Sequence, residues 1–68
     1  ETKQVRLVIH NTLGQTIRTL INSVQKAQSY QVYWDGKDSN GNAVSSGVYI
    51  YRLMTDDTSV SRKMIYIR

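Results

Sequence analysis

The sequence predicts an all-β domain, a sandwich or small barrel of five or six short strands. Apolar and polar residues alternate in several short runs, which is the period of a half-buried strand. Turn-forming residues separate these runs at intervals of about 8 to 12 residues, the spacing of small sandwiches and barrels. The 68 residues suffice for a single domain over 1–68, and a chain of this size buries only about 60% of its unfolded surface.

The composition argues against several classes of protein. Cysteine is absent, so no disulfide contributes to stability. No apolar stretch approaches the roughly 18 residues of a membrane-spanning helix. Nine Lys and Arg against five Asp and Glu give a net charge of +4, but the basic residues are spread along the chain and form no run. Solvated strand faces explain this distribution better than a nucleic-acid surface, so we expect no nucleic acid and no membrane span.

The first expected strand covers residues 4–10. Val5, Leu7 and Ile9 share one face of it, because successive side chains of a strand point to opposite sides. Residues 11–15 follow as a turn with a glycine, which adopts positive φ at no steric cost.

Residues 16–28 fit two structures. Apolar side chains recur there at helical spacing, which favours an amphipathic helix. Several β-branched residues and the breaker pair Asn22-Ser23 instead favour a short strand over residues 16–21, followed by a loop. Periodicity alone leaves both alternatives open.

The middle of the chain predicts a hairpin loop. Residues 29–34 alternate again, and the polar loop 35–42 follows them with one Asp-Gly and one Asn-Gly dipeptide. These dipeptides reverse strands well, because their glycines take positive φ and the Asp and Asn side chains bond to the backbone nearby. We expect a brief edge strand at 43–46 after this loop.

The strongest alternation begins at Gly47 and runs to about residue 55. Its pattern places Tyr49, Tyr51 and Leu53 toward the core. A tight reversal at two aspartates leads to the last expected strand, residues 59–68. Both faces of that strand are partly apolar, so alternation does not choose which one is buried.

The polar loop is a candidate calcium site. Asp35, Asp38 and Asn40 place oxygen atoms close together, and hard cations prefer such clusters. The Glu that completes an EF-hand loop is absent, so a turn held by Asp and Asn side chains is the favoured interpretation and no other cofactor is expected. His10 is the only histidine, and no motif supplies an activated nucleophile, so we expect no enzyme activity.

The aromatic residues are candidates for a carbohydrate-binding platform, but core packing is the favoured interpretation. Trp34, Tyr49 and Tyr51 occupy positions expected to face the core, where a small sandwich needs large side chains. Tyr33 and Tyr66 are the best candidates for exposed rings.

The order and spacing of five motifs resemble a known family. The motifs are Leu7-Val8-Ile9-His10-Asn11-Thr12-Leu13-Gly14-Gln15, Ile17-Arg18-Thr19-Leu20, Trp34-Asp35-Gly36 through Val44, Ser46-Gly47-Val48-Tyr49-Ile50-Tyr51-Arg52-Leu53 and Ser61-Arg62-Lys63-Met64-Ile65. In these motifs the chain is similar to the Ig-like domain of flagellar hook-capping proteins and to the type IX secretion C-terminal sorting domain that overlaps it.

The resemblance implies an immunoglobulin-like or fibronectin-III-like β-sandwich, with residues 16–21 as a strand. It also implies that the chain is the C-terminal part of a larger secreted bacterial protein. In the sorting-domain subset, the strands read by the export machinery map by position to Gly47, Tyr49 and Lys63. Longer members begin with an additional strand that this chain is expected to lack. Either a partner strand completes the sheet, or the shorter sandwich closes on itself.

From these observations we expect a non-catalytic module, extracellular or on the cell surface, that acts through protein partners. The first expected function is a secretion-sorting or surface-attachment signal recognised by an export machinery. The alternative is a structural assembly module that pairs sheet edges with its parent protein or a neighbouring subunit. Carbohydrate binding is a third possibility.

Overall fold

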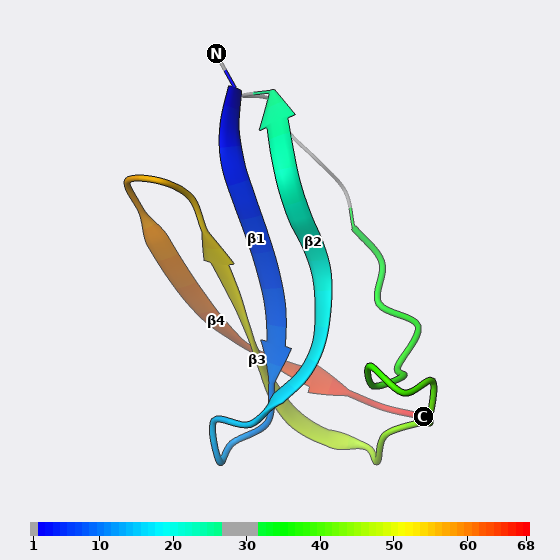
Figure 1. Cartoon of the computed structure of the whole chain (residues 1–68). Coiled ribbons are helices and arrows are strands. Elements are labelled where there is room, and N and C mark those ends of the chain that lie inside the picture. The colour runs from blue at the N-terminus through cyan, green and yellow to red at the C-terminus, as the bar shows by residue number, and fades with distance from the viewer. Residues whose placement is uncertain (1, 27–31) are drawn as a thin grey trace.

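The computed structural model describes residues 2–26 and 32–68, and within them it forms one antiparallel sheet (Figure 1). Its strands are β1 (Thr2–His10), β2 (Thr16–Lys26), β3 (Gly47–Met54) and β4 (Ser59–Tyr66), in the order β2-β1-β3-β4. The predicted all-β class is confirmed. The sandwich of about six strands is not, because the described residues form four strands in a single sheet.

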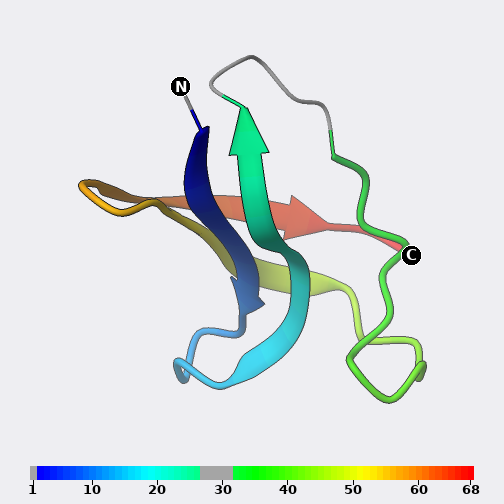
Figure 2. The same cartoon turned by 45° about the horizontal axis from the view of Figure 1, so that its top comes forward.

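The sheet consists of two hairpins that run in different directions (Figure 2). The central strands pair over a short stretch, from Arg6 opposite Met54 to His10 opposite Ile50. Because neighbouring strands are rotated relative to one another, a short central contact lets the hairpins diverge on both sides of it. The inner side of the sheet therefore becomes concave, and the segment 32–46 packs there.

The segment that sequence periodicity left open, residues 16–28, is a strand as far as Lys26. It continues beyond the predicted end at residue 21, because residues 22–26 also pair with β1. The turn before it depends on Asn11, whose Oδ1 accepts hydrogen bonds from the backbone N–H groups of Leu13 (3.0 Å) and Gln15 (2.9 Å). Gly14 adopts φ +83°, as the predicted turn requires.

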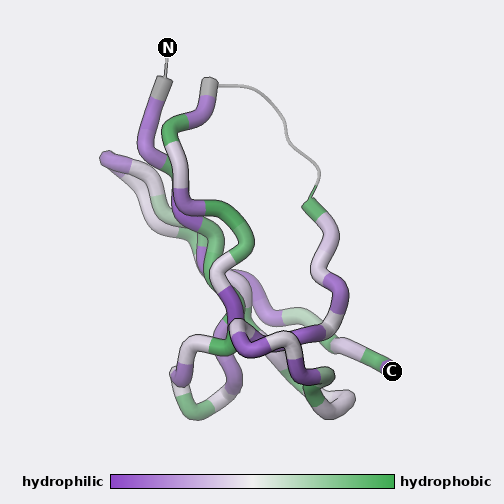
Figure 3. The backbone as a smooth tube through the Cα atoms, turned by 45° about the vertical axis from the view of Figure 1, so that its right-hand side comes forward, coloured by the Kyte–Doolittle hydropathy of each residue, from purple (hydrophilic) through white to green (hydrophobic). Residues whose placement is uncertain are grey.

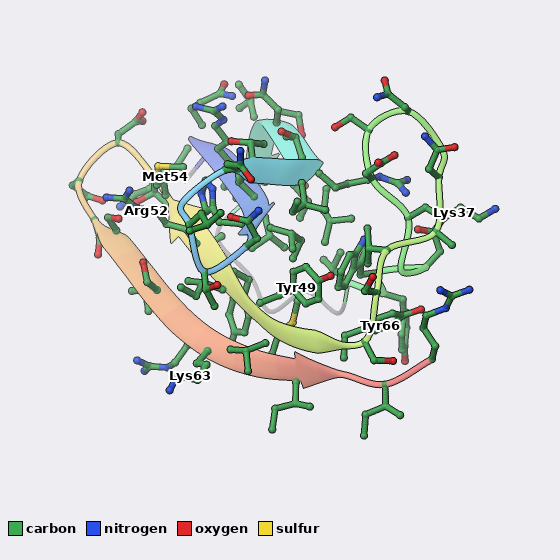
Figure 4. The ribbon with its side chains drawn as sticks, turned by 90° about the horizontal axis from the view of Figure 1, so that it is seen from below. Lys37, Tyr49, Arg52, Met54, Lys63 and Tyr66 are labelled. Atoms are coloured by element: carbon green, nitrogen blue, oxygen red, sulfur yellow. The ribbon has the colours of Figure 1, made fainter. Side chains whose placement is uncertain are left out.

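The hairpin β3–β4 settles the register of the last strand. Pairing runs without interruption from Gly47 opposite Tyr66 to Met54 opposite Ser59. Since paired residues share a face, Met64 and Tyr66 lie on the inner face with Tyr49, and Lys63 and Ile65 lie on the outer face. Figure 4 shows the same division, with Tyr49 and Tyr66 inside the curved hairpin and Lys63 outside it.

The reversal between β3 and β4 occurs where the two aspartates predict it. The N–H of Thr55 donates to the carbonyl of Thr58 at 2.8 Å. Lys3 on β1 contacts this turn, its Nζ lying 2.9 Å from Oδ2 of Asp57. Hydrogen bonds from Lys3 and Thr55 hold the pKa of Asp57 below its ordinary value.

The predicted hairpin around the polar loop is wrong. Residues 32–34 are not in a strand, residues 43–46 form no edge strand, and the loop closes on itself through one isolated bridge between Lys37 and Ala43. Residues 29–31 lie outside the described residues. The backbone of the loop bonds to itself and to β2, where the N–H of Ser39 donates to the carbonyl of Ile17 at 2.9 Å.

The core of the described residues is small. Val8, Ile9 and Tyr49 are its buried hydrophobic side chains. Val8 and Ile9 are consecutive, so both faces of β1 are covered at this point. The prediction that Tyr49 faces the core is confirmed, whereas Leu53 on the same face is 37% exposed. Figure 3 shows hydrophobic residues reaching the C-terminal end, where Ile67 is 79% exposed.

Candidate interaction surface

Three aromatic rings join the segment 32–46 to the inner face of the sheet. The ring centroids of Trp34 lie 5.2 Å from Tyr49 and 5.0 Å from Tyr66, and those of the two tyrosines lie 6.4 Å apart. These distances are those of attractive edge-to-face and tilted aromatic pairs. Tyr66 is thus half-buried, contrary to the prediction of an exposed ring, because its face of β4 is the inner one. Tyr33 is 79% exposed, as predicted.

The polar atoms of this cluster bond to backbone carbonyls. The indole N–H of Trp34 donates to the carbonyl of Lys37 at 2.9 Å, and the hydroxyl of Tyr49 donates to the carbonyl of Ser45 at 2.7 Å. A buried tyrosine that bonds back to a carbonyl a few residues upstream is a recurring feature of immunoglobulin-like domains. Both bonds fix the loop against β3.

The two aspartates of the candidate calcium site already have hydrogen-bond partners. Oδ1 of Asp35 lies 2.7 Å from Nη1 of Arg18 and accepts the N–H of Lys37 at 3.0 Å. Oδ1 of Asp38 accepts the N–H groups of Asn40 (2.9 Å) and Asn42 (3.0 Å). These contacts are those of a turn held by its own side chains, with one carboxylate paired to a cation of β2.

Sequence reasoning missed the contribution of Arg18 to this loop. Its Nη1 also lies 3.4 Å from the carbonyl of Lys37, so it joins β2 to two positions of the loop. No local pattern connects Arg18 with Asp35, because the pair forms only when the loop crosses the beginning of β2.

His10 ends β1, where it lies opposite Thr16 of β2 and Ile50 of β3. It is half-buried, and its Nδ1 is buried with no hydrogen-bond partner among the described residues. Residues 2–26 and 32–68 contain no group of three or more His, Cys, Asp or Glu side chains able to hold a metal ion. In the same residues, no helix is long and apolar enough to span a membrane.

The residues expected to act in sorting lie on one hairpin but differ in solvent exposure. Gly47 and Tyr49 begin β3, and Lys63 lies opposite Ile50 on β4. Tyr49 is 8% exposed and holds the aromatic cluster, so its ring has a structural role here. Lys63 is exposed and points away from the core (Figure 4).

The two edges of the sheet are protected to different extents. The edge strand β2 pairs irregularly with β1, with register shifts at Leu7/Val8 and Ile9/His10, and the loop covers it near Ile17. Bulges and covering loops are the means by which proteins blunt an edge. The other edge strand, β4, is regular along all of its pairing with β3. Within the described residues its outer edge pairs with no other strand. We call this the β4 edge.

Residues 1–59 match the family described as the FlgD Ig-like domain. The chain belongs to the FlgD Ig-like domain family. No curated protein and no solved structure matches the chain.

Membership of the FlgD Ig-like family agrees with the antiparallel sheet and with the Tyr49 contact described above. The family is a non-enzymatic structural domain family. The matched residues end at Ser59, so the FlgD Ig-like match includes β1, β2 and β3 but only the first residue of β4.

Proposed function

We propose that this chain is a non-catalytic structural assembly module that binds a protein partner by adding a strand to the β4 edge. The observation that carries this proposal is the contrast between the two edges of the sheet. The β2 edge is irregular and partly covered, whereas β4 is regular and its outer side pairs with no other strand of the described residues. An unpaired row of backbone N–H and C=O groups is a template for a strand of another chain.

Partly exposed apolar side chains beside β4 support the same proposal. Leu53 and Val60 pair with each other on the inner face and are 37% and 38% exposed. On the outer face Val48 pairs with Ile65, and these side chains are 40% and 73% exposed. An added strand covers apolar groups on both faces of the neighbouring strand, because its side chains alternate between those faces. A partner strand that completes the sheet therefore fits this edge.

An uncharged peptide tests edge binding itself. The probe is a synthetic peptide of the length of β4 in which valine and threonine alternate, added to the full chain. We expect slower hydrogen exchange at backbone amides of Ser59–Tyr66 and unchanged exchange in β2. The control is the same peptide with proline at alternate positions, which lacks the N–H groups that a ladder needs. Unchanged exchange in β4, or equal protection by the proline peptide, would refute edge binding.

A secretion-sorting signal is the second candidate, together with the extracellular or cell-surface location that it requires. It is supported by the pairing that places Gly47 and Lys63 on one hairpin with Lys63 exposed. Fusion to a reporter in a host with a type IX route should export the reporter, and removal of residues 63–68 should stop export. Because this deletion removes half of β4, the variant Lys63→Ala is compared with it. This variant tests the recognition of Lys63 in a chain that keeps the whole strand. A reporter retained inside the cell by the intact fusion would refute the sorting function.

A further inference from the structure

The charges of the β4 edge restrict what can add to it. Arg62 and Lys63 occupy the middle of β4, and neither β3 nor β4 contains an acidic residue. Both side chains are exposed, and neither forms an ion pair with any described residue. Asp57, in the turn next to β4, is paired with Lys3. The positive charge of this edge is therefore not neutralised within residues 2–26 and 32–68.

A second copy of the chain is a poor partner for the β4 edge. Two β4 strands that pair antiparallel through this same edge keep their inner faces on one side, so pairing about Arg62 or about Lys63 would place that cation opposite its counterpart in the other copy. In parallel pairing of the same two edges one copy is turned over, and a shift of one residue brings Arg62 beside Lys63 of the other copy. Like charges directly opposite one another destabilise a strand pair. Arg62 and Lys63 therefore disfavour pairing between copies of the chain. The edge stays available to a segment of different sequence.

The alternation of β4 fixes where a partner must carry its negative charges. Arg62 lies on the inner face with Met64, and Lys63 lies on the outer face with Ile65. Residues opposite one another in neighbouring strands share a face. A strand that meets both cations must therefore carry two consecutive carboxylates, one on each face. Opposite Met64 and Ile65 it requires two consecutive apolar residues.

We propose that the β4 edge binds an extended protein segment in which two consecutive acidic residues adjoin two consecutive apolar residues, and that it does not bind a second copy of this chain. This inference rests on the edge-binding function proposed above and names the chemistry of its partner. Opposite charges supply attraction and register, and the backbone ladder supplies the remaining affinity.

Three peptides of the length of β4 test this inference on the full chain. The first contains two consecutive glutamates with two valines on either side, in a background of threonine, so that it meets the requirement in parallel and in antiparallel pairing. The second has the same composition, with its glutamates at alternate positions so that both lie on one face. The third replaces the glutamates of the first with lysines. Binding is measured by fluorescence anisotropy at low salt, and hydrogen exchange at Ser59–Tyr66 locates the bound peptide.

We expect the first peptide to bind at least about tenfold more tightly than the other two, because it alone forms both opposite-charge pairs. Its binding should weaken with added salt, which screens exposed charges. The double variant Arg62→Glu with Lys63→Glu should reverse the preference, so that the lysine peptide binds more tightly. The matched control, Arg6→Glu with Lys37→Glu, changes the net charge equally at exposed positions outside β4 and should keep the preference for the first peptide.

The outcomes separate this inference from the proposal on which it rests. Equal binding of all three peptides at β4 would refute the acidic pair and leave edge binding intact. Equal binding of the two acidic peptides would show that the edge attracts negative charge wherever it lies along the peptide. This result would also refute the requirement for two consecutive acidic residues. A dimer in sedimentation, with β4 amides protected in the absence of peptide, would show that a second copy occupies the edge. Failure of the uncharged and acidic peptides alike to protect β4 would refute edge binding itself.

Discussion

Gly36 shows how closely the polar loop approaches the sheet. It is buried at φ +75°, and a methyl group in place of its hydrogen would overlap the hydroxyl and ring of Tyr66. The ring has little freedom to withdraw, because it also packs against Trp34 and Tyr49. A residue without a side chain is therefore required here by the backbone conformation and by the available space.

Gly36→Ala should be clearly more destabilising than Gly41→Ala. Gly41 has φ +84°, but a methyl group added there would meet no atom within 4 Å, so its substitution costs only the backbone strain, about 1 kcal/mol. Gly36→Ala adds overpacking against Tyr66, which costs typically about 1 to 3 kcal/mol more. The free energies of unfolding from urea titrations measure both effects. Equal values would show that the aromatic cluster shifts without cost to admit the methyl group.

Among the elements, the turn between β1 and β2 depends most clearly on one side chain. Asn11 accepts two backbone N–H groups through Oδ1, and its Nδ2 donates to Oε1 of Gln15 at 2.7 Å. Asn11→Ala should therefore destabilise the chain by about 1 kcal/mol, since water replaces these acceptors only in part. Thr12→Ala, at an exposed position of the same turn, is the control and should have little effect. Similar unfolding free energies for the two variants would contradict this account of Asn11.

At this scale, local alternation predicted the strands better than the connections. Alternation located β1 and β3. Residues 3–7 of β1 do alternate between half-buried and exposed, and in β3 the buried Tyr49 follows the exposed Val48. Alternation left residues 16–28 open between helix and strand, since only pairing with β1 decides the conformation. It failed for the loop 35–42, whose dipeptides do turn the chain but whose position depends on Arg18 and on the carbonyl of Ile17. Distant contacts of this kind leave no pattern in a short stretch of sequence.

The candidate interaction surface was likewise predictable only in part. The positions of Gly47 and Lys63 on adjacent strands follow from alternation and from the tight reversal between them. Their solvent exposure does not follow from the sequence, because it depends on which face of β4 packs against Trp34. That face was undecided in the sequence, and the same uncertainty produced the wrong prediction for Tyr66.

For the whole molecule, the small core and the β4 edge together predict how stability depends on partners. Few of the described side chains are fully buried, so the stability of the free chain should be modest. A second copy is disfavoured by charge at β4, and the melting temperature of the free chain should therefore not change with protein concentration. A partner that binds only the folded chain stabilises it by mass action, by about 1.4 kcal/mol at ten times its dissociation constant.

The peptide with two consecutive glutamates should accordingly raise the melting temperature. For a domain of this size a gain of about 1.4 kcal/mol corresponds to roughly 5 to 10 °C. Melting curves followed by circular dichroism, with and without peptide and over a wide range of protein concentration, measure both dependences. The variant Arg62→Glu with Lys63→Glu should fold but lose the stabilisation by this peptide. A melting temperature that rises with protein concentration alone would mean that copies of the chain complete one another, and that the cations of β4 do not prevent it.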